Sequence, residues 1–353
     1  MSNTLNVMQS NLIPRHRLKH IPRNLRLAHE YCFFLHDTWV QMLGEYERAK
    51  AHHINIPLRN KEEKKQFLRL SKSRDPIDTL RTMGLDDEAK RVILNHITLA
   101  MTSDCAHHIY EALLCFEKRK YIPGFNLLRK PLLETLTYLA WLVSDEADFY
   151  AEFMSGDPEK LSQKRIGNRR TEIFEGAVSA AKLGQVLTAN SIVSSIYDPK
   201  NERGLYRLFQ HAVHLITVER VEIRTSPENF NFIFKNPFDD DIYEAVYETL
   251  PEVFLFLSHI ILCLFERIRP AERGATRAFV FRSTAGFRIL QSEENASAIS
   301  RMMSAEFSER TNCVNCGAPL KFTIHNTARV LLSDTHRCAT CRQVSWFPLS
   351  WMF

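Results

Sequence analysis

The chain has 353 residues, of which 45% are hydrophobic and 25% charged, and its formal net charge is +5 at pH 7. These values are typical of a globular protein with one large domain or two smaller ones. The 11 glycines are few for a sandwich or barrel, and neither a G-x-G-x-x-G nor a Walker-type loop occurs. The composition therefore argues against a nucleotide-hydrolysing protein, while the mild positive charge permits an anionic partner.

Residues 1–23 form a basic N-terminal arm, because no acidic residue precedes Glu30. Such an arm can contact nucleic acid, and the alternative is a solvated, poorly ordered terminus. Residues 1–28 lack the continuous apolar segment of a secretory signal. Scattered cysteines are typical of a reduced core, so we expect a cytoplasmic protein without membrane contact. The basic residues are Arg15, Arg17, Lys19, Arg23 and Arg26, and the scattered cysteines are Cys32, Cys105, Cys115 and Cys263.

Apolar residues recur at helical spacing through residues 24–270, which we predict to be one helical domain. The apolar run at residues 253–265 is too short to span a bilayer and predicts a buried helix. Residues 121–124 are predicted as a turn, Pro131 as a kink or a helix start, and residues 222–238 as an irregular loop. The predicted helices cover residues 25–48, 86–118, 126–143, one or two segments within 159–193, 202–218 and 239–267.

Residues 271–310 have a different pattern and are predicted to connect the helical domain to a C-terminal module. Two short runs rich in aromatic and branched residues, 277–282 and 287–290, predict strands. Residues 293–307 predict a helix. The apolar segment 346–353 at the end of the chain is expected to pack on the helical domain.

Four cysteines near the C-terminus have the spacing of a metal site. Cys313 and Cys316 form one C-x2-C pair, and Cys338 and Cys341 form a second after 21 residues. Two such pairs can supply four thiolates to one tetrahedral zinc ion, which would be structural because no coordination position stays open. Two disulfides are the alternative, and the absence of a secretory signal argues against them.

The residues around these cysteines resemble the zinc-ribbon family, within residues 311–353. Gly317 follows the first pair, where the turn needs an unusual backbone angle. Leu320, Phe322 and Ile324 alternate as in a strand, so the cysteine pairs are expected at the tips of two β-hairpins. The resemblance implies a module that binds nucleic acid or protein.

The predicted helix at residues 202–218 carries a cationic stripe. At 100° per residue, Arg203, Arg207, His211 and His214 lie on one face, and no carboxylate of this helix joins them. Such a face suits a phosphate-bearing ligand, and an imidazole can act as general acid or base near neutral pH. The alternative is a solvated helix face with two incidental histidines.

The segment Arg207–His214 is an R-x6-H and resembles the R-x4-6-H motif of the HEPN superfamily of helical bundles. The segment 128–134, with Arg129 and Glu134, is similar to one in uncharacterised bacterial helical proteins. In HEPN ribonucleases the Arg and His of two protomers meet across a dimer cleft and cleave RNA without metal, with the ribose 2′-hydroxyl as nucleophile. The resemblance implies that Arg207 stabilises the phosphate and His214 transfers the proton, with His211 as a substitute. Leu208 stands where the family commonly has Asn, Asp or His.

A second polar cluster lies on one side of the helix predicted at residues 86–118. Asp104, His107, His108 and Glu111 share one side of it, as in a carboxylate–imidazole metal site. A metal-dependent hydrolase would need further ligands, such as Glu134 or Asp145, from a facing helix. The alternative is a solvated or hydrogen-bonded face.

The sequence thus predicts an all-α helical bundle with a small C-terminal β-rich zinc ribbon. The resemblance implies an RNA-acting protein, a metal-independent endoribonuclease of a bacterial toxin or antiviral defence type, that acts as a homodimer. The first alternative is a non-catalytic module that binds nucleic acid or, through the ribbon, a protein. The second is a metal-dependent helical-bundle hydrolase.

Overall fold

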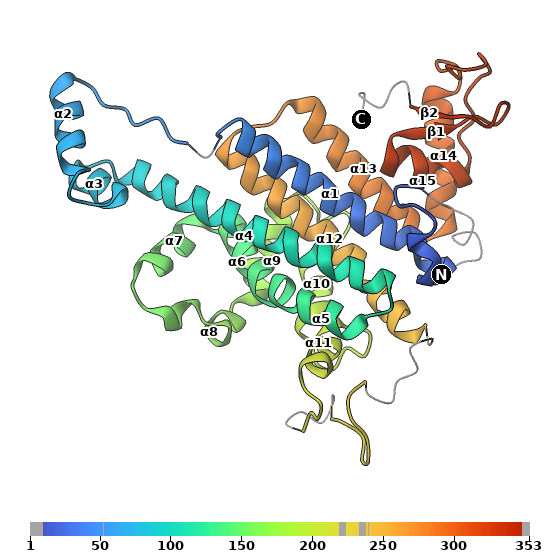
Figure 1. The fold of residues 1–353 in the computed structure, drawn as a ribbon, viewed down its shortest axis with the longest axis horizontal. Helices are drawn as coiled ribbons and strands as arrows, with labels where there is room; N and C mark the ends of the chain where they lie inside the picture. Colours follow the sequence, from blue (N-terminus) through green and yellow to red (C-terminus); the bar gives the residue numbers. More distant parts are fainter. Residues whose placement is uncertain (1–9, 52, 219–223, 233–237, 239, 348–353) are drawn as a thin grey trace.

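A computed structural model describes residues 10–51, 53–218, 224–232, 238 and 240–347. The protein is mostly helical, with one small two-stranded sheet near the C-terminus (Figure 1). The helices α2 (Lys61–Leu70) and α3 (Pro76–Thr82) lie at one end of the molecule, and the sheet lies at the other. The predicted fold class, a helical bundle with a small C-terminal sheet and four clustered cysteines, is confirmed.

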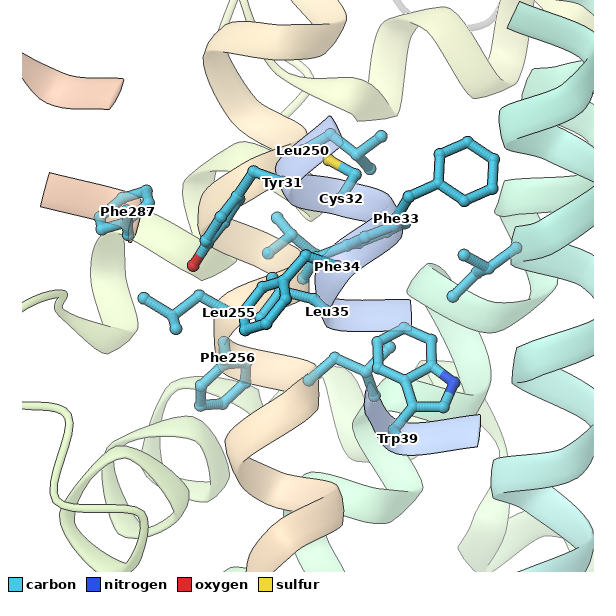
Figure 2. Close-up of a cluster of buried hydrophobic side chains, with 14 of the residues drawn as sticks. Tyr31, Cys32, Phe33, Phe34, Leu35, Trp39, Leu250, Leu255, Phe256 and Phe287 are labelled. Atoms are coloured by element: carbon cyan, nitrogen blue, oxygen red, sulfur yellow. The ribbon is translucent and has the colours of Figure 1, made fainter. Parts of the chain in front are cut away.

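Three long helices form the centre of the bundle: α1 (Arg26–Arg48), α4 (Asp86–Glu117) and α12 (Asp241–Ile268). Helix α1 packs along α12, where the Trp39 ring lies 6.0 Å from that of Phe254, and Figure 2 shows Tyr31 directed towards Phe287 and Phe33 directed to the opposite side of α1. Helix α12 is long and apolar enough to cross a membrane, but 83% of its most apolar window is buried inside the protein. The apolar run at 253–265 therefore belongs to a core helix, as predicted.

The shorter helices complete the bundle around α4 and α12, and the predicted turn at residues 121–124 is wrong. These residues begin α5, since Gly124 lets the helix pass close to Phe116. The helices are α5 (Tyr121–Lys130), α6 (Leu136–Ser144), α7 (Glu146–Met154), α8 (Gln163–Gly167), α9 (Arg170–Ala180), α10 (Ala189–Tyr197) and α11 (Leu205–Val213), with 3₁₀ turns at Arg17–His20, Arg23–Leu25 and Pro158–Leu161.

Pro131 introduces a widened π-helical segment, Pro131–Thr135, between α5 and α6. Proline has no backbone N–H, so the carbonyl one turn before it loses its usual partner and the helix widens locally. The Tyr197 hydroxyl donates to the carbonyls of Leu132 and Leu133 at 3.2 and 3.1 Å. The chain therefore continues as a helix through Pro131, and a side chain from α10 stabilises the irregular turn.

The N-terminal segment 10–25 is folded against the bundle and is not a solvated arm. Ile13, Leu18 and Ile21 are buried, and the fully buried Glu30 accepts hydrogen bonds from the backbone N–H groups of Ser10 and Ile13. Burial raises the pKa of Glu30, and these donors oppose that shift. The segment is thus held by apolar contacts and by one interior carboxylate.

Arg17 fixes the same segment to α4 through Glu117. Its guanidinium donates two hydrogen bonds to this carboxylate, at 2.9 and 2.6 Å, and His29 lies 3.4 Å away on the other side. Burial alone would raise the pKa of Glu117, but hydrogen bonds from His29 and Arg17 outweigh it and the pKa lies below its ordinary value. The carboxylate is therefore ionised and joins three segments.

Replacement of Glu117 by alanine is expected to lower the free energy of unfolding by about 2–3 kcal/mol, because Arg17 and His29 lose their shared acceptor. The matched control is Glu306→Ala, which removes an exposed ion pair with Arg310 and should change stability by no more than about 0.5 kcal/mol. Urea unfolding of both variants measures the difference. Equal losses would show that the Glu117 network contributes nothing beyond a surface ion pair.

The strands predicted at 277–282 and 287–290 are wrong, because both runs belong to α13 (Arg273–Gln291). Buried residues recur along it at helical spacing and face α1, α12 and α15 (Ile324–Ser333): Phe279, Ser283, Phe287 and Leu290. The helix predicted at 293–307 is confirmed as α14 (Glu293–Phe307). The hydrophobic core continues from the bundle through α13–α15 into the cysteine-rich module.

Candidate metal centre

Two turns of the same form carry the four cysteines. In the first, the Gly317 N–H donates to the Cys313 carbonyl at 2.9 Å, and the Cys313 N–H donates to Ala318 at 2.8 Å. In the second, Arg342 and Cys338 make the equivalent bonds at 3.1 and 3.0 Å. Gly317 has φ +71° and Arg342 has φ +63°. The left-handed position predicted at Gly317 therefore occurs twice, once with glycine and once with arginine.

The four sulfur atoms converge on one point. All lie within 4.8 Å of one another, with 3.7 Å between Cys313 and Cys341 and 3.7 Å between Cys316 and Cys338. Metal–sulfur bonds of about 2.3 Å place the corners of a regular tetrahedron about 3.8 Å apart. The cysteines therefore fit a tetrahedral metal ion, and four thiolates leave no position for a reacting water molecule.

Backbone groups prepare the cysteines for a metal. The Asn315 N–H donates to the Cys313 sulfur and the Thr340 N–H to the Cys338 sulfur, each at 3.4 Å. Backbone hydrogen bonds, from Cys341 and then Thr340, hold the pKa of Cys338 below its ordinary value. A stabilised thiolate is the form that binds metal, so the turn favours the ligand state of Cys338.

The secondary structure of the module differs from the two predicted hairpins. Leu320 and Phe322 are buried, but Ile324 begins α15 (Ile324–Ser333). This helix takes up 10 of the 21 residues that separate the two cysteine pairs in the sequence. Thr323 and Asn326 form a capping box that starts this helix. The sheet contains only β1 (Thr335–Arg337) and β2 (Val344–Trp346), which pair antiparallel.

The aromatic residues at the end of the module divide between core and surface. Phe347 is buried and its ring lies 5.4 Å from that of Phe307, whereas Trp346 is 72% exposed. Phe347 thus packs on α14 and within the cysteine module, and the packing of segment 346–353 on the helical domain of residues 24–270 stays a prediction. Residues 348–353 lie outside the described part of the chain.

The cationic stripe predicted at 202–218 is shorter than expected. Helix α11 ends at Val213, and His214 is exposed and extended. The Asn231 side chain donates to the His214 carbonyl at 2.7 Å and so draws the chain away from the helix. Arg207 and His211 are half-buried on α11, one turn apart. The structure therefore brings two of the three predicted catalytic residues onto one helix.

Arg203 has an acidic neighbour that its own helix does not supply. It lies before α11 and forms an ion pair with Glu248 of α12 at 3.2 Å. The sequence predicted a face without carboxylates on this helix, but the neighbouring helix α12 places the Glu248 carboxylate beside Arg203. Arg203 is therefore less available to an anionic ligand than the sequence pattern indicated.

The polar cluster of α4 does not converge as a ligand set. Lys130 pairs with Asp104 at 2.9 Å, while His107 and Glu111 are exposed. Asp145 accepts the Asp148 N–H and begins α7. Within the described residues, the only group of three or more converging metal-binding side chains is the cysteine set. The hypothesis of a metal-dependent hydrolase therefore gains no support.

Basic side chains of the cysteine module were missed as candidate binding residues. Lys321, Arg329, Arg337 and Arg342 fall within 22 residues that contain a single carboxylate, Asp334. This local excess of basic residues is the feature of the sequence that could have identified them. No family model, curated protein or solved structure matches the chain. The evidence for a function therefore lies in the residues of the site: four clustered cysteines that could hold a metal ion, within a basic module of a helical protein.

Proposed function

We propose that the protein binds nucleic acid, with RNA as the favoured class, through the module of residues 311–347, and that the metal is zinc. The main support for this proposal is the positive charge of the module surface around the second cysteine pair. Lys321, Arg337 and Arg342 are exposed there, and among the described residues none of them forms an ion pair. Exposed, uncompensated cations attract phosphates, whose contacts supply most of the affinity for nucleic acid.

The choice of zinc follows from the ligands. Zinc and iron both accept four thiolates in a tetrahedron, but only zinc has no redox chemistry and commonly serves as a structural ion in small modules. One zinc per chain would join the two cysteine turns and so fix the second, which contains Arg342 and directly follows Arg337. The metal would therefore shape the binding surface without entering a reaction.

Salt-dependent binding tests the proposal. The metal-loaded protein should bind a labelled single-stranded RNA, and log K should fall linearly with log salt concentration. The triple variant Lys321→Gln, Arg337→Gln, Arg342→Gln should bind at least about tenfold more weakly, with a slope reduced by about 2, because each phosphate contact contributes about 0.7 for single strands.

A control triple variant, Lys64→Gln, Arg69→Gln, Lys72→Gln, has the same charge change at the opposite end of the molecule (Figure 1). It should bind RNA nearly as the unsubstituted protein does. Equal losses of RNA affinity in both triple variants would show that the affinity depends only on the net charge of the protein. If the same surface bound one partner protein in a 1:1 ratio and without RNA, the result would favour the alternative, a protein-binding module.

Catalysis is a second candidate function, favoured by one observation at the end of α11. Val213, Leu215, Ile216 and Val218 are between 46% and 61% exposed beside His214. Exposed apolar side chains at this density favour a protein contact. A second copy seated there would place two sets of Arg207, His211 and His214 near one interface. This arrangement is what the HEPN resemblance requires of a homodimeric, cytoplasmic endoribonuclease of the toxin or defence type.

A further inference from the structure

A cavity of about 740 Å³ lies between the N-terminal segment and the cysteine module. Its lining contains five cations from separate parts of the chain and no carboxylate. Arg15 comes from the N-terminal segment, Arg329 from α15, and the remaining three from the loops and strand around the cysteines. The cations are Arg15, Lys321, Arg329, Arg337 and Arg342, and His325 lies beside them.

Arg329 is the least solvated of these cations. It is half-buried, and its Nη1 donates to the Thr335 hydroxyl at 3.2 Å. Burial lowers its pKa, the positive charges of Arg337 and Arg15 lower it further, and the negative charge of Glu30 opposes part of that shift. Among the described residues no carboxylate pairs with it. A half-buried cation beside like charges is costly to hold, and a bound anion would offset that cost.

Arg15 is held at this cavity by the fold. The backbone of Ser10 and Ile13 is bound to Glu30, and the Ser333 hydroxyl donates to the Ser10 carbonyl at 3.1 Å. The N-terminal segment is therefore attached both to the bundle and to the end of α15. Its position beside the module does not depend on a ligand.

The cavity offers groups for phosphate and few for bases. Four of its cations are guanidinium groups, whose planar forks match phosphate oxygens. No Phe, Tyr or Trp is part of the described lining, so it offers no large aromatic ring on which a base could stack. The Asn326 amide is already used, since its nitrogen donates to the Lys321 carbonyl at 2.6 Å and its oxygen accepts from Thr323 at 2.8 Å.

We infer that this cavity is a binding site for the phosphodiester backbone of nucleic acid, built jointly by the N-terminal segment, α15 and the cysteine module, with Arg15 and Arg329 as binding residues. The inference rests on the proposed function and deepens it. It places the site at the junction of module and body, and it makes recognition independent of base sequence.

The test uses the metal-loaded, full-length protein and its variants Arg15→Gln, Arg329→Gln and Arg329→Lys. Binding to labelled single-stranded oligo-A, oligo-C and oligo-U is measured across salt concentrations. Each glutamine variant should weaken binding to all three by about tenfold and lower the salt slope by about 0.7. Arg329→Lys should restore part of the loss, because lysine keeps the charge without the fork. Arg301→Gln, an exposed arginine of α14, is the control and should bind normally.

Thermal unfolding separates a binding role from a structural one. Arg329→Gln removes like-charge repulsion, so its Tm should be unchanged or higher, while 1 mM tripolyphosphate should raise the Tm of the unsubstituted protein and not that of the variant. A lower Tm with full RNA binding would overturn the inference. Loss confined to one oligonucleotide would overturn recognition of the backbone.

The failures of the two proposals are distinguishable. If RNA binds and the module triple variant weakens it, but Arg15→Gln and Arg329→Gln bind normally, the inference fails and the proposed function stands. If the unsubstituted protein binds no RNA, the proposed function fails. In that case the phosphate site survives only if tripolyphosphate stabilises the protein through Arg329.

Discussion

Replacement of Cys338 by serine is expected to remove the metal and unfold the module of residues 311–347. Cys338 is buried, and its sulfur is shared between the backbone of its own turn and the tetrahedral site. Three thiolates and a hydroxyl bind zinc poorly. In small zinc modules metal binding contributes on the order of 10–16 kcal/mol to folding, which is more than the stability of a typical domain.

The packing beneath the metal determines how far the damage extends. The Phe322 ring lies 6.0 Å from Phe307 and 5.5 Å from Phe347, so unfolding of the module exposes an aromatic cluster that α14 shares. We expect loss of helical signal from α14 and α15, binding of a hydrophobic dye, and retention of α1, α4 and α12. Circular dichroism and dye fluorescence measure these effects.

Metal analysis provides the direct measurement. The unsubstituted protein should contain one zinc per chain and Cys338→Ser should contain none. The control is Cys115→Ser, which changes a half-buried cysteine of α4 far from the site in sequence and should keep one equivalent. An unchanged metal content in Cys338→Ser would contradict the four-cysteine site. Iron in place of zinc would contradict only the proposed identity of the metal.

Replacement of His214 by alanine is expected to lower the rate of RNA cleavage by about 10²–10⁴-fold, if the second candidate function holds, because a positioned general acid or base contributes that much. Cleavage should leave a 2′,3′-cyclic phosphate and proceed without added divalent metal. Arg207→Ala should lose activity through weaker charge stabilisation, and Arg207→Lys should recover part of it. His211→Ala should have a smaller effect.

The matched control is His107→Ala, which replaces an exposed histidine of α4 that the Arg207–His214 mechanism does not use. It should cleave RNA at the unsubstituted rate. Cleavage that is unchanged in the Arg207→Ala, His214→Ala double variant would contradict the assignment. RNA that is bound but remains intact in every condition would leave nucleic-acid binding as the whole function.

Local sequence patterns determined the parts of this protein that depend on neighbouring residues. The two C-x2-C pairs predict a tetrahedral ligand set, because each short turn presents two thiols to the same side. Helical periodicity located α1, α4, α12 and α14 to within two residues at each end. A long apolar run, broken only by Ser258 and His259, identified α12 as a core helix, since a helix that is buried on every side must be apolar on every side.

Tertiary contacts decided the features for which local patterns were ambiguous. The short run at 277–282 fits a strand as well as a helix, and it is helical because Phe279 and Phe287 pack on α1 and α12. Helix α11 stops before His214 because Asn231, seventeen residues later, binds the His214 carbonyl. In both cases the deciding contact comes from residues that lie far away in the sequence.

The candidate nucleic-acid site shows the same division. The charge bias of residues 321–342 is present in the sequence, but Arg15 lies more than three hundred residues from these cations. The buried carboxylate of Glu30, which binds the backbone of Ser10 and Ile13, and the Ser333 hydroxyl, which binds the Ser10 carbonyl, hold Arg15 beside Arg329 and Arg337. Sequence composition determines which charges a protein carries, whereas long-range burial and hydrogen bonding decide which of them meet.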